Sequence, residues 1–134
     1  MKDVKIPTRR AVGKGEHTAG DITRGIILNH LQSFLNNDVE AVISDYTEDA
    51  ILMTQAKTYT GPEEIKGFFL GLLVHFPKDR SGFDLEQLFV SNELAYIVWH
   101  AKTPTVHVAI GTDTFFIKEG KIHRQTFAGR FNYL

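Results

Sequence analysis

The sequence contains no cysteine, two methionines and one tryptophan among 134 residues, and it has no hydrophobic run long enough to cross a membrane. The absence of cysteine excludes disulfide scaffolds, thiol catalysis and zinc–thiolate sites. An excess of positive charge is also lacking, because the formal net charge is −1 and the pI is about 6.6. This balance argues against a nucleic-acid partner. The length predicts one domain with a hydrophobic core of its own.

The first twenty residues differ from the rest in charge. They carry five basic and two acidic residues, a net charge of +3, whereas the remainder carries ten basic and fourteen acidic residues, a net charge of −4. This segment lacks the continuous apolar stretch of a secretory signal, so we expect a cytoplasmic protein with no membrane partner. We interpret residues 1–20 as a basic arm, mobile or laid over a neighbour, with a mitochondrial presequence as the alternative. Residues 21–134 form the predicted domain.

The first half of that domain has helical periodicity. Asp21 is the predicted N-cap of a first helix, and Asp38 of a shorter second one. Pro62 opens a third helix, which Pro77 ends. Short strands are expected at residues 50–53 and 58–60. The apolar stripe of the first helix, at i, i+3, i+4, i+7 and i+8, consists of Ile27, His30, Leu31, Phe34 and Leu35.

The second half has the composition of strands. Four segments rich in β-branched and aromatic residues, at 85–90, 93–102, 106–118 and 121–133, are separated by turn signals. Glu119-Gly120 predicts a three-residue hairpin loop. Helices followed by a long meander predict an α+β fold, in which a curved antiparallel sheet wraps around the N-terminal helices and encloses a cone-shaped cavity.

Three motifs carry a resemblance to a known family. The run from Asn37 to Val42, followed by residues 46–50, resembles the "G-D-x-E-A-h … h-x-x-D-A" signature of NTF2-like domains. Residues 61–69 resemble the family's third helix, "G-x-e-x-I-x-x-F-F", and residues 113–122 resemble its final hairpin. The most similar branch is the SnoaL-like group, which includes polyketide cyclases and is related to ketosteroid isomerase. The resemblance implies a cystatin-like, cone-shaped α+β barrel, often dimeric through the outer face of the sheet, but no particular activity.

Ketosteroid isomerase uses an aspartate base and an oxyanion hole made of a tyrosine and a protonated aspartic acid. The resemblance places the protonated acid at Asp113, the tyrosine at His30 and the tyrosine's supporting partner at Tyr46. The base falls near Thr54, and threonine cannot serve as that base. The isomerase mechanism is therefore not carried over intact.

The residues themselves indicate an inward-facing carboxyl group. With a three-residue loop at Glu119-Gly120, Asp113 faces Gln125 across the hairpin, and Phe115 faces His123. Asp113 then shares an apolar face, and burial there raises the pKa of a carboxyl group unless a cation pairs with it.

His30 is the candidate partner of Asp113, and a His30–Asp113 pair could shuttle a proton. The alternatives are a buried, hydrogen-bonded histidine and a carboxylate that caps the sheet edge or binds backbone. The predicted catalytic residues are His30 and Asp113, and the predicted substrate-binding residues are Tyr46, Thr54, Tyr96, Val98, Phe115, Gln125 and Phe127.

Two further interpretations concern the central strands. If Thr103-Pro104 closes a short hairpin, His100 and His107 lie opposite one another, but a zinc site needs at least three protein ligands, so no metal or other cofactor is expected. The residues on the other face suggest outer-sheet packing and a homodimer interface. They are Ala95, Ile97, Trp99, Ala101, Val106, Val108 and Ile110.

The sequence therefore predicts a small SnoaL-like protein that binds a hydrophobic, oxygen-bearing small molecule. Its chemistry would be cofactor-free acid–base isomerisation, cyclisation or hydration. Here His30 would be the base or proton shuttle and Asp113 the acid or orienting group, while Tyr46 and Gln125 would hold the substrate oxygen.

The alternative is a non-catalytic ligand-binding or protein-association module. An enzyme that uses this pair requires a His30–Asp113 contact, direct or through one bridging water, inside an open cavity. A larger separation, or a cavity filled by Phe68, Phe69 and Phe127, would rule it out in favour of the module.

Overall fold

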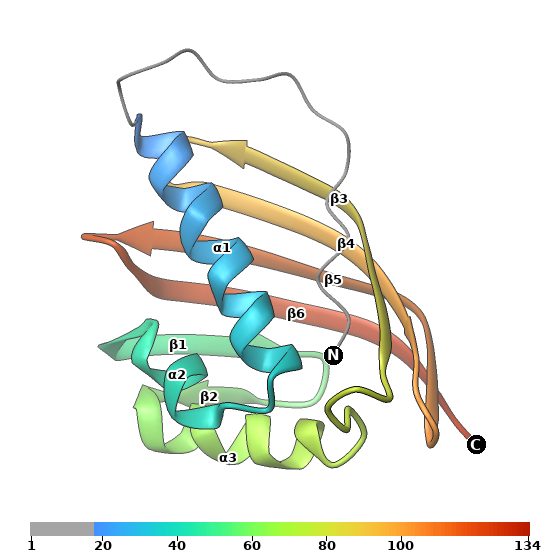
Figure 1. Cartoon of the computed structure of the whole chain (residues 1–134). Coiled ribbons are helices and arrows are strands. Elements are labelled where there is room, and N and C mark those ends of the chain that lie inside the picture. Colours follow the sequence, from blue (N-terminus) through green and yellow to red (C-terminus); the bar gives the residue numbers. More distant parts are fainter. Residues whose placement is uncertain (1–17) are drawn as a thin grey trace.

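The computed structural model describes residues 18–134, so the predicted basic arm lies almost entirely outside the described residues. Between those limits no helix has the length and apolar character needed to span a bilayer. The chain folds as helices followed by an open, curved, six-stranded sheet (Figure 1). In chain order the elements are α1 (Ala19–Leu35), α2 (Val39–Ser44), β1 (Tyr46–Thr54), β2 (Thr58–Thr60), α3 (Gly61–Leu73), β3 (Gly82–Ser91), β4 (Leu94–Lys102), β5 (Val106–Lys118) and β6 (Lys121–Tyr133).

The start of α1 corrects one boundary. Thr18, not Asp21, is the N-cap, and its hydroxyl accepts a hydrogen bond from the Asp21 amide while the Asp21 carboxylate accepts one from the Thr18 amide. This reciprocal capping box satisfies two amide groups that the first turn leaves unpaired. Ala19 and Gly20, which we had assigned to the arm, are therefore helical.

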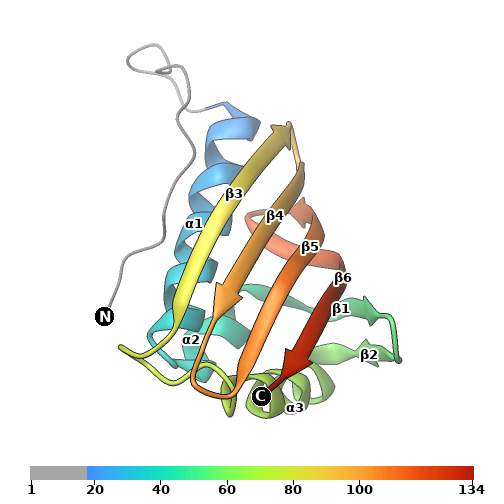
Figure 2. The same cartoon turned by 90° about the vertical axis from the view of Figure 1, so that its right-hand side faces the viewer.

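The sheet runs in the order β2-β1-β6-β5-β4-β3. All neighbours are antiparallel except β1 and β6, which pair in parallel, so the prediction of an antiparallel sheet holds for four of its five strand pairs. α1 lies along the concave side of the sheet and α3 lies beside β1 and β2 at one end (Figure 1). In the view turned by 90°, β3, β4, β5 and the end of β6 lie in front of the helices (Figure 2).

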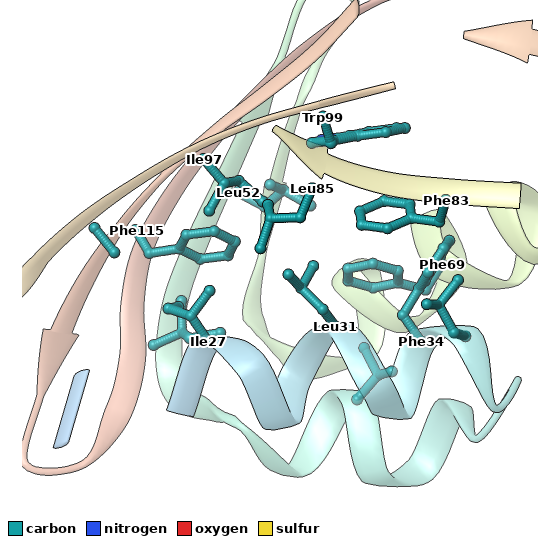
Figure 3. Close-up of a cluster of buried hydrophobic side chains, with 14 of the residues drawn as sticks. Ile27, Leu31, Phe34, Leu52, Phe69, Phe83, Leu85, Ile97, Trp99 and Phe115 are labelled. Carbon is teal, nitrogen blue, oxygen red and sulfur yellow. The ribbon is translucent and has the colours of Figure 1, made fainter. Parts of the chain in front are cut away.

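The core lies between α1, α3 and the concave face. Apolar side chains of α1 meet Phe69 of α3 and the inward side chains of the strands in one cluster (Figure 3). Trp99 of β4 is part of this cluster, 5% exposed, with its ring stacked on Phe83 at 5.1 Å. The prediction that Trp99 packs on the outer face is therefore wrong.

A β-bulge explains the inversion. The register between β4 and β5 shifts between Trp99 and Ala101, and that between β5 and β6 shifts between Val108 and Ile110. An extra residue in one strand reverses the in–out alternation beyond it, so both Val108 and Asp113 point inward although one is even-numbered and the other odd. Six of the seven residues predicted for the outer face are consequently buried, and Ile110 alone is exposed. The six buried ones are Ala95, Ile97, Trp99, Ala101, Val106 and Val108.

The final hairpin also differs in register. Lys118 pairs with Lys121, so the loop has two residues, Glu119 and Gly120, both with positive φ. This is the geometry of a type I′ turn.

The two-residue loop moves the register by one residue, and a bulge between the Phe116 and Ile117 pairs moves it by one more. Asp113 therefore faces Phe127, where we predicted Gln125, and Phe115 faces Gln125, where we predicted His123. The error is an even number of residues, so the inward placement of Asp113 is unaffected.

Candidate functional site

A continuous set of hydrogen-bonded side chains crosses the interior from α1 to β4. We call it the polar row, and its members, in order of contact, are Asp45, His30, Tyr46, Gln125, Asp113 and Trp99. Four different strands and helix α1 contribute to it, together with the C-cap of α2. No side-chain polar atom buried among the described residues is left without a hydrogen-bond partner.

One end of the polar row is a histidine–carboxylate pair. His30 lies on the buried stripe of α1, and its Nδ1 is 2.8 Å from Oδ2 of Asp45. Its Nε2 is 3.3 Å from the hydroxyl oxygen of Tyr46. Asp45 was not among the predicted site residues, although its position directly before Tyr46, where α2 ends and β1 begins, was a signal that could have identified it.

The other end is a buried carboxylate. Asp113 accepts hydrogen bonds from Trp99 Nε1 at 2.8 Å and from Gln125 Nε2 at 2.9 Å. Burial raises the pKa of Asp113 to about 6, because the two hydrogen bonds that favour the charged form offset only part of the desolvation. The inward placement of Asp113 is confirmed, whereas Trp99 was missed as its partner.

A glycine could have identified Trp99. A Cβ added to Gly111 of β5 would lie 2.3 Å from the indole ring, so that ring occupies the space where a side chain would be. A glycine in the middle of a strand often marks such a close approach. Gly111 was therefore a signal that another group approaches β5 closely at this position.

His30 and Asp113 do not contact each other, which corrects the predicted pair. Tyr46 and Gln125 lie between them, and the Tyr46 hydroxyl donates to Gln125 Oε1 at 2.5 Å. Burial, followed by the negative charges of Asp113 and Asp45, raises the pKa of Tyr46 well above its ordinary value, so the hydroxyl keeps its hydrogen. A direct His30–Asp113 proton shuttle is excluded by this arrangement.

Beside the polar row lies a small interior pocket of about 40 Å³. Among its lining residues are His30, Asp113, Gln125, Phe115 and Phe127, so these predicted site residues are brought together. The volume is enough for a water molecule or one polar group but not for a substrate. Aromatic rings of α1, α3 and the strands occupy the rest of the predicted cavity.

A much larger hollow, of about 640 Å³, lies between α3 and β6 and is open to solvent. We call it the α3–β6 groove. Thr54, Lys57, Tyr59, Gly71 and Phe131 are among the residues that line it. Ligand pockets commonly measure roughly 300–1,000 Å³, so the groove has the size of a small-molecule site. Thr54, predicted to bind substrate, lines this groove and not the interior pocket.

The two hollows share a wall. Phe68 and Leu72 of α3 and Phe127 of β6 line both the groove and the interior pocket. Phe68 and Phe127 are only partly buried, and their ring centroids are 6.0 Å apart. These side chains therefore separate the groove from the pocket beside Asp113.

Two predicted binding residues lie elsewhere. Tyr96, 39% exposed, and Val98 of β4 pair with Thr114 and Thr112 on the outer face of the sheet, away from the polar row. The bulge between β4 and β5 is again the reason, because it reverses the faces that simple alternation assigned. The expectation that they line the interior is wrong.

The proposed opposition of His100 and His107 is also wrong, because His107 pairs with Lys102. His100 instead lies between two carboxylates of β3, with Nε2 2.8 Å from Asp84 and Nδ1 2.5 Å from Glu86. Within residues 18–134 no group of three or more His, Asp or Glu side chains is arranged to hold a metal ion.

The fold is shared with several solved structures. A protein assigned as a ketosteroid isomerase from Kribbella flavida superposes with a TM-score of 0.71 at 15% identity, over 87% of this chain and 84% of the other. An NTF2-like protein of unknown function from Mesorhizobium loti superposes with a TM-score of 0.69 at 16% identity, over 87% of this chain and 97% of the other. A protein assigned as a SnoaL-like polyketide cyclase from Shewanella denitrificans superposes with a TM-score of 0.67 at 14% identity, over 81% of this chain and 90% of the other. These identities show a common fold alone.

No curated protein matches the sequence. The model of the SnoaL-like domain, in contrast, matches residues 27–125, which include every member of the polar row. This match covers most of the chain and agrees with the helices-then-sheet architecture and the structural neighbours. The chain therefore belongs to the SnoaL-like domain family.

Proposed function

We propose that the protein binds a small hydrophobic, oxygen-bearing molecule in the α3–β6 groove, with the oxygen directed toward Asp113. The observation that carries this proposal is the shared wall, since Phe68, Leu72 and Phe127 separate a groove of ligand size from a pocket that holds a single polar group. An apolar skeleton fits the aromatic sides of the groove, and the pocket supplies the few polar atoms that orient a ligand.

The composition of α3 supports the same site. Gly67 and Gly71 lie one turn apart on the face that lines the groove, and a Cβ added to either would have no neighbour within 4 Å. Glycine inside a helix is unfavourable by about 0.5–1 kcal/mol relative to alanine. The open volume beside these two residues is the space that a ligand would fill.

The test uses tetralin as an apolar probe and 2-tetralol as its oxygen-bearing counterpart, measured by isothermal titration calorimetry. Gly71→Leu fills the groove, and Gly25→Leu is the matched control, because Gly25 is an exposed glycine of α1 with equally open surroundings. We expect binding to the wild type and to Gly25→Leu, and at least tenfold weaker binding to Gly71→Leu. Equal binding to both variants, or no binding to the wild type, would contradict the proposal.

Acid–base catalysis is the second candidate, and the raised pKa of Asp113 favours it. A carboxyl group with a pKa of about 6 can accept a proton near neutral pH, which suits isomerisation, cyclisation or hydration. In this version Asp113 alone is the base, and His30 acts only through the polar row. Exchange of the C1 protons of 2-tetralone with D₂O, followed by NMR, tests it. Acceleration that is lost in Asp113→Asn supports catalysis, and its absence favours the binding module.

We also propose that the protein forms a homodimer through the outer face of the sheet. Of the residues predicted for this face only Ile110 is exposed, and the other exposed apolar side chains there include Phe89, Tyr96 and Phe116. Phe89 and Tyr96 stack at 6.4 Å across β3 and β4. Light scattering after size exclusion should report a dimer that Tyr96→Glu dissociates and Ile22→Glu, on an exposed apolar residue of α1, does not. A monomeric wild type would overturn it.

A further inference from the structure

The polar row determines which hydrogen-bonding groups the interior pocket can offer to a ligand. Gln125 donates one amide hydrogen to Asp113, so its carbonyl oxygen faces Tyr46 and receives the single hydroxyl hydrogen. The Tyr46 oxygen then accepts from His30 Nε2, and His30 Nδ1 shares a proton with Asp45. Both nitrogens of His30 and the hydroxyl hydrogen of Tyr46 are thereby committed within the row.

The same groups of the row are committed when the direction of the hydrogen bonds along it is reversed. Rotation of the Gln125 amide by 180° lets a protonated Asp113 donate to the Gln125 carbonyl, lets Gln125 donate to Tyr46, and lets Tyr46 donate to His30 Nε2. Both arrangements contain the same number of protons. In each of them Trp99 donates to Asp113, and the Asp113 oxygens retain unused acceptor positions.

Beside the pocket, the polar row therefore has more unused hydrogen-bond acceptors than unused donors. The two Asp113 oxygens have four acceptor positions, of which Trp99 and Gln125 occupy two. The only uncommitted donor of the row members that line the pocket is the second amide hydrogen of Gln125. The pocket thus presents an acceptor-rich surface with a single donor.

This inventory fits a hydroxyl group and not a carbonyl group. A hydroxyl can donate to Asp113 and accept from Gln125, so it satisfies both partners. A carbonyl oxygen can accept from Gln125 but places its lone pairs against the Asp113 carboxylate, and an unpaired buried polar group is costly. The pocket volume of about 40 Å³ suits a group of this size.

We propose that the interior pocket selects ligands that carry a hydroxyl group, an alcohol or an enol, over the corresponding ketones and hydrocarbons, with Asp113 accepting the hydroxyl hydrogen. This proposal rests on the ligand-binding function of the α3–β6 groove. It makes Asp113 a specificity-determining residue and Gln125 its positioning partner. The polar row, in contrast to the oxyanion hole of ketosteroid isomerase, offers no tyrosine hydroxyl and no protonated carboxyl hydrogen to a carbonyl oxygen.

The experiment compares tetralin, 2-tetralol and 2-tetralone, which share one skeleton, by calorimetry at pH 7.5. We expect 2-tetralol to bind the wild type about tenfold or more tightly than the other two, because it alone satisfies both polar partners. The indole N–H signal of Trp99, the only tryptophan, should shift with 2-tetralol, since Asp113 then shares its charge with the ligand.

Asp113→Asn provides the matched variant, because it keeps the shape of the side chain and adds a donor. We expect the ratio of 2-tetralol to 2-tetralone affinity to fall to within about twofold, while tetralin binding changes little. Thermal denaturation verifies that this variant is folded, and the wild-type comparison stands without it.

The two proposals fail differently. Equal binding of all three compounds, or tighter binding of the ketone, overturns the hydroxyl selection and leaves the groove as a ligand site. Failure of all three to bind overturns both. A preference for 2-tetralol that persists unchanged in folded Asp113→Asn overturns the role of Asp113.

Discussion

The interior pocket and the α3–β6 groove lie on two sides of the same three side chains, Phe68, Leu72 and Phe127, yet they are built differently. The pocket measures about 40 Å³ and is bordered by a polar row in which every buried polar atom has a partner. The groove measures about 640 Å³ and is lined by exposed turn residues, aromatic rings and helical glycines. The hydrogen-bonding groups of the polar row therefore border the closed pocket, whereas the volume that could hold a small molecule lies in the open groove.

Because of this difference, the two regions should respond unequally to substitution. Polar groups in a dry interior depend on one another, so removing one leaves others unsatisfied. Groups around an open groove can exchange their partners for water at little cost.

The largest effect is expected from Gln125→Leu. Leucine leaves the Tyr46 hydroxyl and the Asp113 carboxylate each without one partner, so the free energy of unfolding should fall by about 3–4 kcal/mol. Gln55→Leu is the matched substitution in the groove, where the side chain is exposed and accepts one bond from the Gly129 amide. It should cost at most about 0.5 kcal/mol. Urea denaturation measures both, and equal losses would contradict the comparison.

The next effect is the pH dependence contributed by Asp113. Its pKa is raised from about 3.9 in the unfolded chain to about 6, so the folded state holds the proton more tightly. The contribution of Asp113 to the free energy of unfolding therefore falls as the pH rises from about 4 to about 6. It does not change at lower or at higher pH. Asp113→Asn removes this dependence, so its stability relative to the wild type should improve by up to about 3 kcal/mol between pH 4 and pH 7.5.

The control for this prediction is Asp49→Asn. Asp49 is exposed, and a hydrogen bond from Thr47 is the main cause that lowers its pKa, so its contribution to stability has the opposite sign and is lost on acidification. Chemical denaturation at several pH values measures both variants. If the difference in free energy of unfolding between Asp113→Asn and the wild type does not change with pH, Asp113 is not desolvated.

The third prediction concerns ligand selection at acid pH. The preference for 2-tetralol over 2-tetralone, about tenfold at pH 7.5, should fall to about threefold or less at pH 5, because a protonated Asp113 is a weaker acceptor. Tyr46 keeps its hydroxyl hydrogen throughout, and both nitrogens of His30, which also lines the pocket, are hydrogen-bonded to Asp45 and Tyr46. Calorimetry at both pH values measures the ratio. An unchanged ratio would show that the preference for 2-tetralol does not depend on the charge of Asp113.

The smallest effect is expected from Gly71→Ala in the groove. A Cβ meets no atom there and alanine favours the helix, so the free energy of unfolding should rise by about 0.5–1 kcal/mol. Gly111→Ala provides the interior counterpart and should destabilise, because its Cβ would overlap the Trp99 ring. Thermal denaturation measures both, and stabilisation by Gly111→Ala would show that the ring is free to move.

The site was only partly predictable. The apolar stripe of α1 identified His30 as a buried residue, and the alternation of β5 and β6 correctly turned Asp113, Phe115 and Gln125 inward. The partners were misassigned, because a side chain's alternation tells which face it occupies and not which residue it touches. Asp45 pairs with His30 from the end of another helix, and Trp99 reaches Asp113 from a neighbouring strand.

The order of elements, the α+β class and the family resemblance follow from the sequence alone, because periodicity, capping residues and turn signals are local properties. The same is true of the missing cysteine, which leaves His, Asp, Tyr, Gln and Trp to build the polar row. Only the tertiary structure decided how these residues meet. A bulge that adds one residue to β5 places Trp99 on the inner face and Tyr96 on the outer face, and its position is defined by the pairing of β5 with both neighbouring strands.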